Sequence, residues 1–149
     1  MTYTLHAYFL PEHREQPAVA RTAEEVNAII DELLAQDYDS SMATMVIAEQ
    51  RDADEYIAEL SIGVDPDRGV GSAQYATPDG AWFTKGQPST HPEVLYCYFG
   101  NEREFPHDSE IPLSELRTVV ATFLATGGRR TGSVSWQDAM PVAGPSSGQ

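Results

Sequence analysis

Hydrophobic positions recur with helical spacing in two segments of the chain. In the first segment, Thr22 and Glu25 have the spacing of a capping box, and the apolar stripe that follows is Val26, Ile29, Ile30, Leu33 and Leu34. In the second, Pro112 suits a first helical position and Gly127-Gly128 ends the helix; its apolar residues are Leu113, Leu116, Val119, Val120, Phe123 and Leu124. The sequence therefore predicts two amphipathic helices that each bury one face.

Alternating or β-branched runs predict strands around these helices. We expect strands within residues 3–10, 43–49, 56–64, 69–76, 81–85, 94–99 and 131–136. Residues 11–21 read as a polar connector, 50–54 as a charged turn, and 139–149, rich in Pro, Gly and Ser, as a flexible tail. This order predicts an α+β fold with a mainly antiparallel sheet of about six or seven strands and two helices on one face. We expect one domain over residues 1–138.

The stretch 93–112 carries most of the functional signals. Its part 94–99 is β-branched and aromatic and is predicted to be a central strand. The part 100–110 is predicted to be an exposed loop, because the residue before Pro106 is pushed away from helical geometry. This loop is acidic, since it contains Glu102, Glu104, Asp108 and Glu110.

The charge balance is unusual. Nine basic residues against 23 acidic ones give a net charge of −14, which opposes direct binding to nucleic acid or to an anionic membrane and permits a basic protein partner. Cys97 is the single cysteine, and its position in a strand predicts a buried small hydrophobic residue. The chain begins without a signal or membrane-spanning pattern, so we expect a cytoplasmic protein.

Catalytic signals are weak. His6, His13, His91 and His107 lack the spacing of metal ligands, and no glycine-rich motif for a nucleotide cofactor is present. The best enzymatic candidate is the pair Glu102 and Glu104 with His107 nearby, but an exposed loop offers no apolar pocket that would tune a carboxylic acid for catalysis. The sequence predicts a protein that is not an enzyme and uses no metal or cofactor. A small acidic enzyme and a self-associating structural protein are the alternatives.

A recognition surface explains these residues better. Aromatic side chains supply contact area, and carboxylates steer a basic partner. The candidate anchors are Trp82, Tyr96, Tyr98 and Phe105. Core packing is the favoured assignment for Tyr96 and Trp136, and Phe105 would serve equally as a plug that fixes the loop to the sheet.

Several motifs resemble those of a known family. They are Val94-Leu-Tyr-Cys-Tyr-Phe-Gly100, Glu104-Phe-Pro106, Glu110-Ile-Pro112, Phe123-Leu-Ala-Thr-Gly127, Val134-Ser-Trp-Gln137 and the Gly-Ala-Trp-Phe piece that ends at Phe83. Together they resemble polymorphic-toxin immunity proteins, the group paired mainly with nucleic-acid deaminase toxins. Arg130 departs from this pattern, which has proline before the last strand, and Cys97 replaces a larger or polar residue.

The resemblance implies a cytoplasmic antidote that binds a cognate toxin domain and blocks its active site without catalysis of its own. Position by position it points to Trp82, Glu104, Phe105 and Trp136. Combined with the charge, it predicts that the protein fills a basic substrate groove and has its contacts at Trp82, Glu102, Glu104, Phe105, Asp108 and Glu110. Tyr96, Tyr98 and Trp136 are expected to be structural. We expect a monomer that contacts neither nucleic acid nor membrane.

Overall fold

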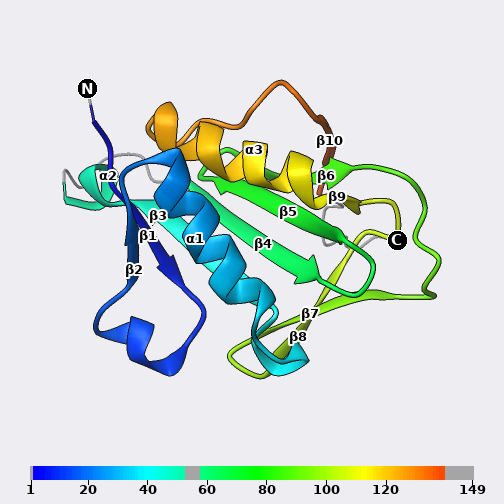
Figure 1. The fold of residues 1–149 in the computed structure, drawn as a ribbon. Coiled ribbons are helices and arrows are strands. Elements are labelled where there is room, and N and C mark those ends of the chain that lie inside the picture. The colour runs from blue at the N-terminus through cyan, green and yellow to red at the C-terminus, as the bar shows by residue number, and fades with distance from the viewer. Residues whose placement is uncertain (1, 53–57, 140–149) are drawn as a thin grey trace.

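One large antiparallel sheet runs through the computed structural model, which describes residues 2–52 and 58–139 (Figure 1). Its eight strands are β1 (Leu5–Tyr8), β2 (Ala18–Ala20), β3 (Met42–Ile47), β4 (Glu59–Asp65), β5 (Val70–Thr77), β6 (Gly80–Lys85), β9 (Ile111–Pro112) and β10 (Ser135–Asp138). Their order is β10-β6-β5-β4-β3-β1-β2, with the short β9 paired to the start of β5. The predicted α+β class and antiparallel sheet are confirmed.

Two helices cover one face of the sheet (Figure 1). They are α1 (Ala23–Leu34) and α3 (Leu113–Ala125), and shorter helical segments are η1 (Pro11–Arg14), η2 (Tyr38–Ser40) and α2 (Ala48–Asp52). The predicted cap of α1 forms, because the Glu25 N–H donates to Thr22 Oγ1 at 3.1 Å. The end of α3 closes on Gly127 and Gly128, whose φ angles of 71° and 109° suit glycine.

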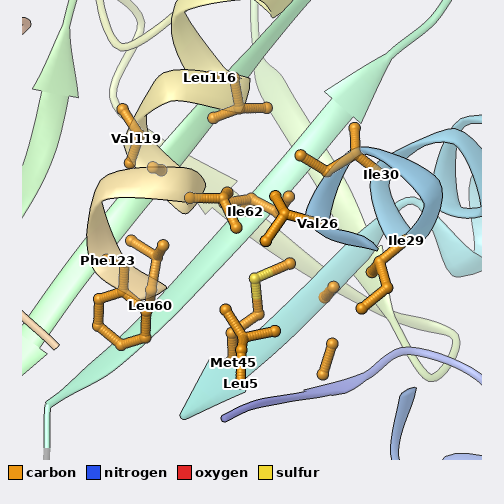
Figure 2. Close-up of a cluster of buried hydrophobic side chains, with 14 of the residues drawn as sticks. Leu5, Val26, Ile29, Ile30, Met45, Leu60, Ile62, Leu116, Val119 and Phe123 are labelled. Atoms are coloured by element: carbon orange, nitrogen blue, oxygen red, sulfur yellow. The ribbon is translucent and has the colours of Figure 1, made fainter. Parts of the chain in front are cut away.

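The main core lies between these helices and the sheet (Figure 2). Alternate residues of each strand point into it, so Leu60, Ile62 and Val64 of β4 meet the apolar stripes of both helices. The helical side of this core includes Val26, Ile30, Leu116 and Phe123, each with no exposed surface. The alternation that predicted the elements therefore also fixes which face of the sheet the helices cover.

A β-hairpin packs on the opposite face of the sheet. It consists of β7 (Val94–Tyr98) and β8 (Asn101–Phe105), which pair only with each other. A second apolar cluster joins the hairpin to the sheet; it contains Met42, Val94, Tyr96 and Phe105, with Phe83 and Tyr98 packed against it. The molecule thus has three layers, with the hairpin as the outermost on the side away from the helices.

Two predictions about the stretch 93–112 are wrong. Residues 94–99 are not a central strand but the first strand of the separate hairpin, because their apolar residues pack on the face of the large sheet instead of entering its ladder. Part of the predicted loop 100–110 is β8, since Phe105 is buried in the second cluster and holds the segment extended against β7.

Other differences lie in short segments. The connector 11–21 contains η1 and β2, and His13 supports the turn by accepting the N–H groups of Phe9 and Leu10 at its Nδ1 (3.2 and 3.0 Å). The turn predicted at 50–54 begins as helix α2. The first residues of the strand predicted at 56–64, and all but the start of the tail predicted at 139–149, lie outside the described residues.

Substitution of Gly63 by alanine should destabilise the fold. A Cβ at this position would lie 2.2 Å from Cγ of the Tyr96 ring, which has no room to retreat inside the second cluster. We expect a loss of about 2 to 3 kcal/mol in the free energy of unfolding, measured by chemical denaturation. Gly132→Ala is the control, because a Cβ there meets nothing within 4 Å. Equal stability of the two variants would contradict the packing described here.

Candidate partner-binding site

The tip of the hairpin has an unusual backbone. The two-residue turn consists of Phe99 and Gly100, with φ angles of 51° and 79°. A positive φ is rare for a residue as large as phenylalanine and costs on the order of 1 kcal/mol. The turn is held from outside, since the Gly100 N–H donates to the Asp39 carbonyl at 3.1 Å and the Arg14 guanidinium lies 4.6 Å from the centre of the Phe99 ring.

The outer strand of the hairpin presents two carboxylates to solvent. Glu102 and Glu104 alternate with Arg103 along β8, so both side chains lie on the face away from the second cluster. Tyr38 of η2 donates its hydroxyl to Glu102 at 2.7 Å. Partial burial and this hydrogen bond to a carboxylate both raise the pKa of Tyr38. The bond ties the hairpin to η2, the helical turn that follows α1.

A cleft of about 610 Å³ lies beside the hairpin. Apolar side chains of α1, β4 and β7 form part of its wall, among them Leu33, Val64 and Leu95. Its carboxylates are Asp37, Asp65, Asp67, Glu93 and Glu110. Among the residues that the structure describes, none forms a salt bridge with Asp37, Asp67 or Glu93. The cleft is therefore a hollow with uncompensated negative charge.

Among the described residues that line this cleft, Arg68 is the one arginine or lysine, and it already pairs with two carboxylates. Its Nε lies 2.9 Å from Asp65, and its two terminal nitrogens contact the two oxygens of Glu110. The hydrogen bonds to Glu110 raise the pKa of Arg68. Glu110 is 8% exposed, so the carboxylate of this bidentate pair is largely shielded from water, while the Arg68 side chain is half-buried. Contrary to the predicted exposed loop, Glu110 is buried, and it neutralises Arg68 below the β4–β5 turn.

Asp108 is also engaged within the protein. It accepts hydrogen bonds from Lys85 Nζ at 2.9 Å and from Gln137 Nε2 at 3.0 Å. These two partners lower its pKa below the usual range. The interactions join the segment after β8 to the edge strand β10 and to its neighbour β6. Half-buried Asp108 is less available for contact than Glu102 or Glu104.

The two tryptophans lie on neighbouring strands at one end of the sheet, Trp82 on β6 and Trp136 on the edge strand β10, and pack against the main core. Trp82 and Trp136 each contact the Tyr75 ring, with centroid separations of 6.0 and 6.3 Å. Arg130 covers both, at 4.7 Å from Trp82 and 5.7 Å from Trp136. The residue that departs from the family pattern thus caps this aromatic pair. The structural role expected of Trp136 is consistent with its half-buried position.

The remaining aromatic candidates form the second cluster. Phe105 is 4% exposed and lies between Phe83 and Tyr96, with centroids 5.2 and 5.1 Å away. It has the position of a plug that pins the hairpin, one of the two roles weighed for it. Tyr98 is half-buried on the same cluster, and Cys97 is buried, which confirms the prediction of a small hydrophobic residue there. Burial raises the pKa of the Cys97 thiol.

The candidate catalytic carboxylates Glu102 and Glu104 share one face of β8, but neither lies in the cleft and His107 makes a different contact. Glu102 and Glu104 are exposed and lie outside the lining of the cleft. His107 instead donates through Nε2 to the His91 carbonyl at 2.9 Å. Within residues 2–52 and 58–139, no group of three or more histidine, cysteine or acidic side chains could hold a metal ion.

Sequence reasoning missed the part of the site that comes from other segments. Tyr38 and Asp37 lie in a segment that reads as a simple turn, and Asp67 and Arg68 in one that reads as a hairpin loop. The high density of charged residues in these two turns was the signal in the sequence that could have marked them as part of the site. Nothing in the linear order places these turns beside residues 93–110.

The geometry defines a small α+β domain whose outer hairpin and cleft suit protein recognition. The family comparison agrees: residues 14–138 match the model of Immunity protein Imm1, and the chain belongs to this family. Membership supports an immunity function, implies a protein toxin as partner and suggests a role other than catalysis. No curated protein matches the sequence. In the described part of the chain, no helix has the length and apolarity needed to cross a membrane.

The two ion pairs near the site should differ in their contribution to stability. Arg68→Met leaves Glu110 buried without its cation and should lower the free energy of unfolding by about 2 kcal/mol. Lys85→Met removes a cation whose side chain is 53% exposed and should cost less than about 1 kcal/mol. The double variant Arg68→Met/Glu110→Leu should recover part of the first loss. Denaturant titrations measure all three, and equal effects of the two single variants would refute the assignment.

Asp108 should contribute a pH-dependent increment to stability. Because its pKa is lowered in the folded protein, the increment is fully present above the ordinary carboxyl pKa of about 4 and is lost as the pH falls through the lowered value. Asp108→Asn should therefore be less stable than the wild type at pH 7, by up to about 1 kcal/mol, and equal to it in strong acid. Thermal unfolding across this range measures the difference. A gap that widens as the pH falls would have the wrong sign.

Proposed function

We propose that this immunity protein inhibits a toxin that acts on nucleic acid by filling the toxin's basic substrate groove with the acidic surface around the hairpin. The exposed members of this surface are Asp37, Asp67, Glu93, Glu102 and Glu104. Phe105 and Glu110 are left out of the contact set because both are buried, and Asp108 is at most a peripheral member. Trp82 stays a candidate contact on β6, the strand next to the sheet edge formed by β10.

The observation that carries this proposal is the excess of negative charge in the cleft, where Asp37, Asp67 and Glu93 have no salt-bridge partner among the described residues. The protein has a net charge of −14, and the cation of the cleft is already paired with two carboxylates. Opposite charge accelerates association and selects for a basic partner. An enzyme that binds a phosphate backbone needs a basic groove, so its inhibitor gains from presenting negative charge in that place.

Among such toxins we propose a nucleic-acid deaminase, on the resemblance of the motifs, and we place the inhibition in the cytoplasm. The test is to purify the product of the adjacent open reading frame, measure complex formation, and assay deamination of single-stranded DNA and RNA with and without the immunity protein. A one-to-one complex that abolishes deamination supports the full proposal. A complex with a toxin that catalyses a different reaction would support the immunity function and refute the proposal that the toxin is a deaminase.

Neutralising the hairpin acids should slow binding of the toxin. Glu102→Gln/Glu104→Gln should reduce the association rate constant about tenfold at low salt and flatten its salt dependence, because rim charges act mainly on encounter. Glu24→Gln/Glu115→Gln removes the same charge from the first turns of α1 and α3, on the helical side of the sheet. Surface plasmon resonance compares the pairs. If both slow association equally, overall charge steers the partner and the hairpin has no special part.

A further inference from the structure

We propose that β8 is an open sheet edge that pairs with a β-strand of the toxin, so that the hairpin becomes a three-stranded sheet in the complex. This inference rests on the immunity function for the existence of a toxin partner. It does not depend on the chemistry that the toxin performs.

In the β7–β8 ladder, hydrogen-bonded residue pairs alternate with pairs that are not hydrogen-bonded, and the backbone N–H and C=O groups of the second kind point outward. A two-residue turn makes Tyr98 and Asn101 a hydrogen-bonded pair, and every second pair along the ladder follows it. The pair Cys97 and Glu102 is therefore not hydrogen-bonded. In agreement, the Cys97 N–H points away from β8 and donates to Ser41 Oγ at 3.0 Å.

The same alternation directs the N–H and C=O groups of Glu102 and Glu104 away from β7, toward the outer edge. Within the described part of the chain, these four groups have no hydrogen-bond partner. The first four residues of β8 are exposed, so no other segment among those described covers the edge. An edge of this kind is a template for another strand.

The edge is also rigid before any partner arrives. Phe105 and Tyr96 anchor the hairpin in the second cluster, and the Tyr96 hydroxyl lies 3.1 Å from Ser72 Oγ of β5. At the other end, Asp39 holds the turn through the Gly100 N–H. A partner strand therefore meets a preorganised edge, which lowers the entropic cost of binding.

Charge disfavours a second copy of this chain as the occupant. Two copies of β8 that pair antiparallel through these free groups place Glu102 opposite Glu104 twice, with Arg103 opposite Arg103 at the centre. Like charges directly opposite each other destabilise a pair of strands. A toxin strand with Lys or Arg at alternate positions, separated by an acidic or neutral residue, has the complementary pattern.

The test separates backbone pairing from charge. Glu102→Pro removes an N–H that the β7–β8 ladder does not use, whereas Glu102→Gln removes the charge and keeps the N–H. We expect Glu102→Pro to weaken toxin binding at least a hundredfold and Glu102→Gln less than tenfold, by isothermal titration calorimetry, with melting temperatures that show both variants folded. Equal affinities of the two variants would overturn the proposal.

Amide hydrogen exchange of the wild-type protein, followed by NMR, gives a readout that needs no substitution. The Glu102 and Glu104 amides should exchange rapidly in the free protein and become protected in the complex, with Arg103, inside the ladder, as the internal reference. If the complex forms and these two amides stay unprotected, the proposed pairing of β8 is wrong, while the proposed function still stands. If the wild-type protein does not bind the toxin at all, it is the proposed function that fails.

Discussion

The close approach of Tyr96 to Gly63 determines how this protein presents its outer surface. The missing side chain at Gly63 lets the Tyr96 ring lie against the second face of the large sheet, and its hydroxyl meets Ser72, which in turn accepts from Ser109. This contact fixes the height and direction of the whole hairpin. The cleft, the turn at Phe99 and the exposed edge of β8 all take their positions from it.

Buried charge performs a similar task on the other side of the cleft. Arg68 and Glu110 join the β4–β5 turn to the segment before β9, at a place where Glu110 would be a buried charge without a partner if Arg68 were removed. The pair neutralises itself and adds no net charge to the cleft. Arg68 therefore does not neutralise the carboxylates that face solvent, and their negative charge can attract a partner. The carboxylates that stabilise the fold are different residues from those proposed for binding.

The family motifs belong mainly to the scaffold. Phe105 plugs the second cluster, Glu110 pairs with Arg68, Gly127 ends α3, and Gln137 bonds to Asp108. Of the residues proposed for binding, Glu104 and the candidate Trp82 lie within a motif, whereas Asp37, Asp67, Glu93 and Glu102 lie outside the motifs. Such a division lets one fold serve different toxins, because exposed positions can change without loss of the packing that orients them.

The sequence by itself determined the two helices, the antiparallel sheet and the face that the helices cover, because these follow from local periodicity and caps, as at Thr22. It also determined the acidic character and the burial of Cys97. Only the tertiary structure decided that residues 94–105 form a separate hairpin, that Glu110 is buried and that Asp67 faces the same cleft as Glu93. These outcomes depend on contacts between segments distant in the chain, and periodicity says nothing about which of two apolar strands enters a ladder and which packs on its face.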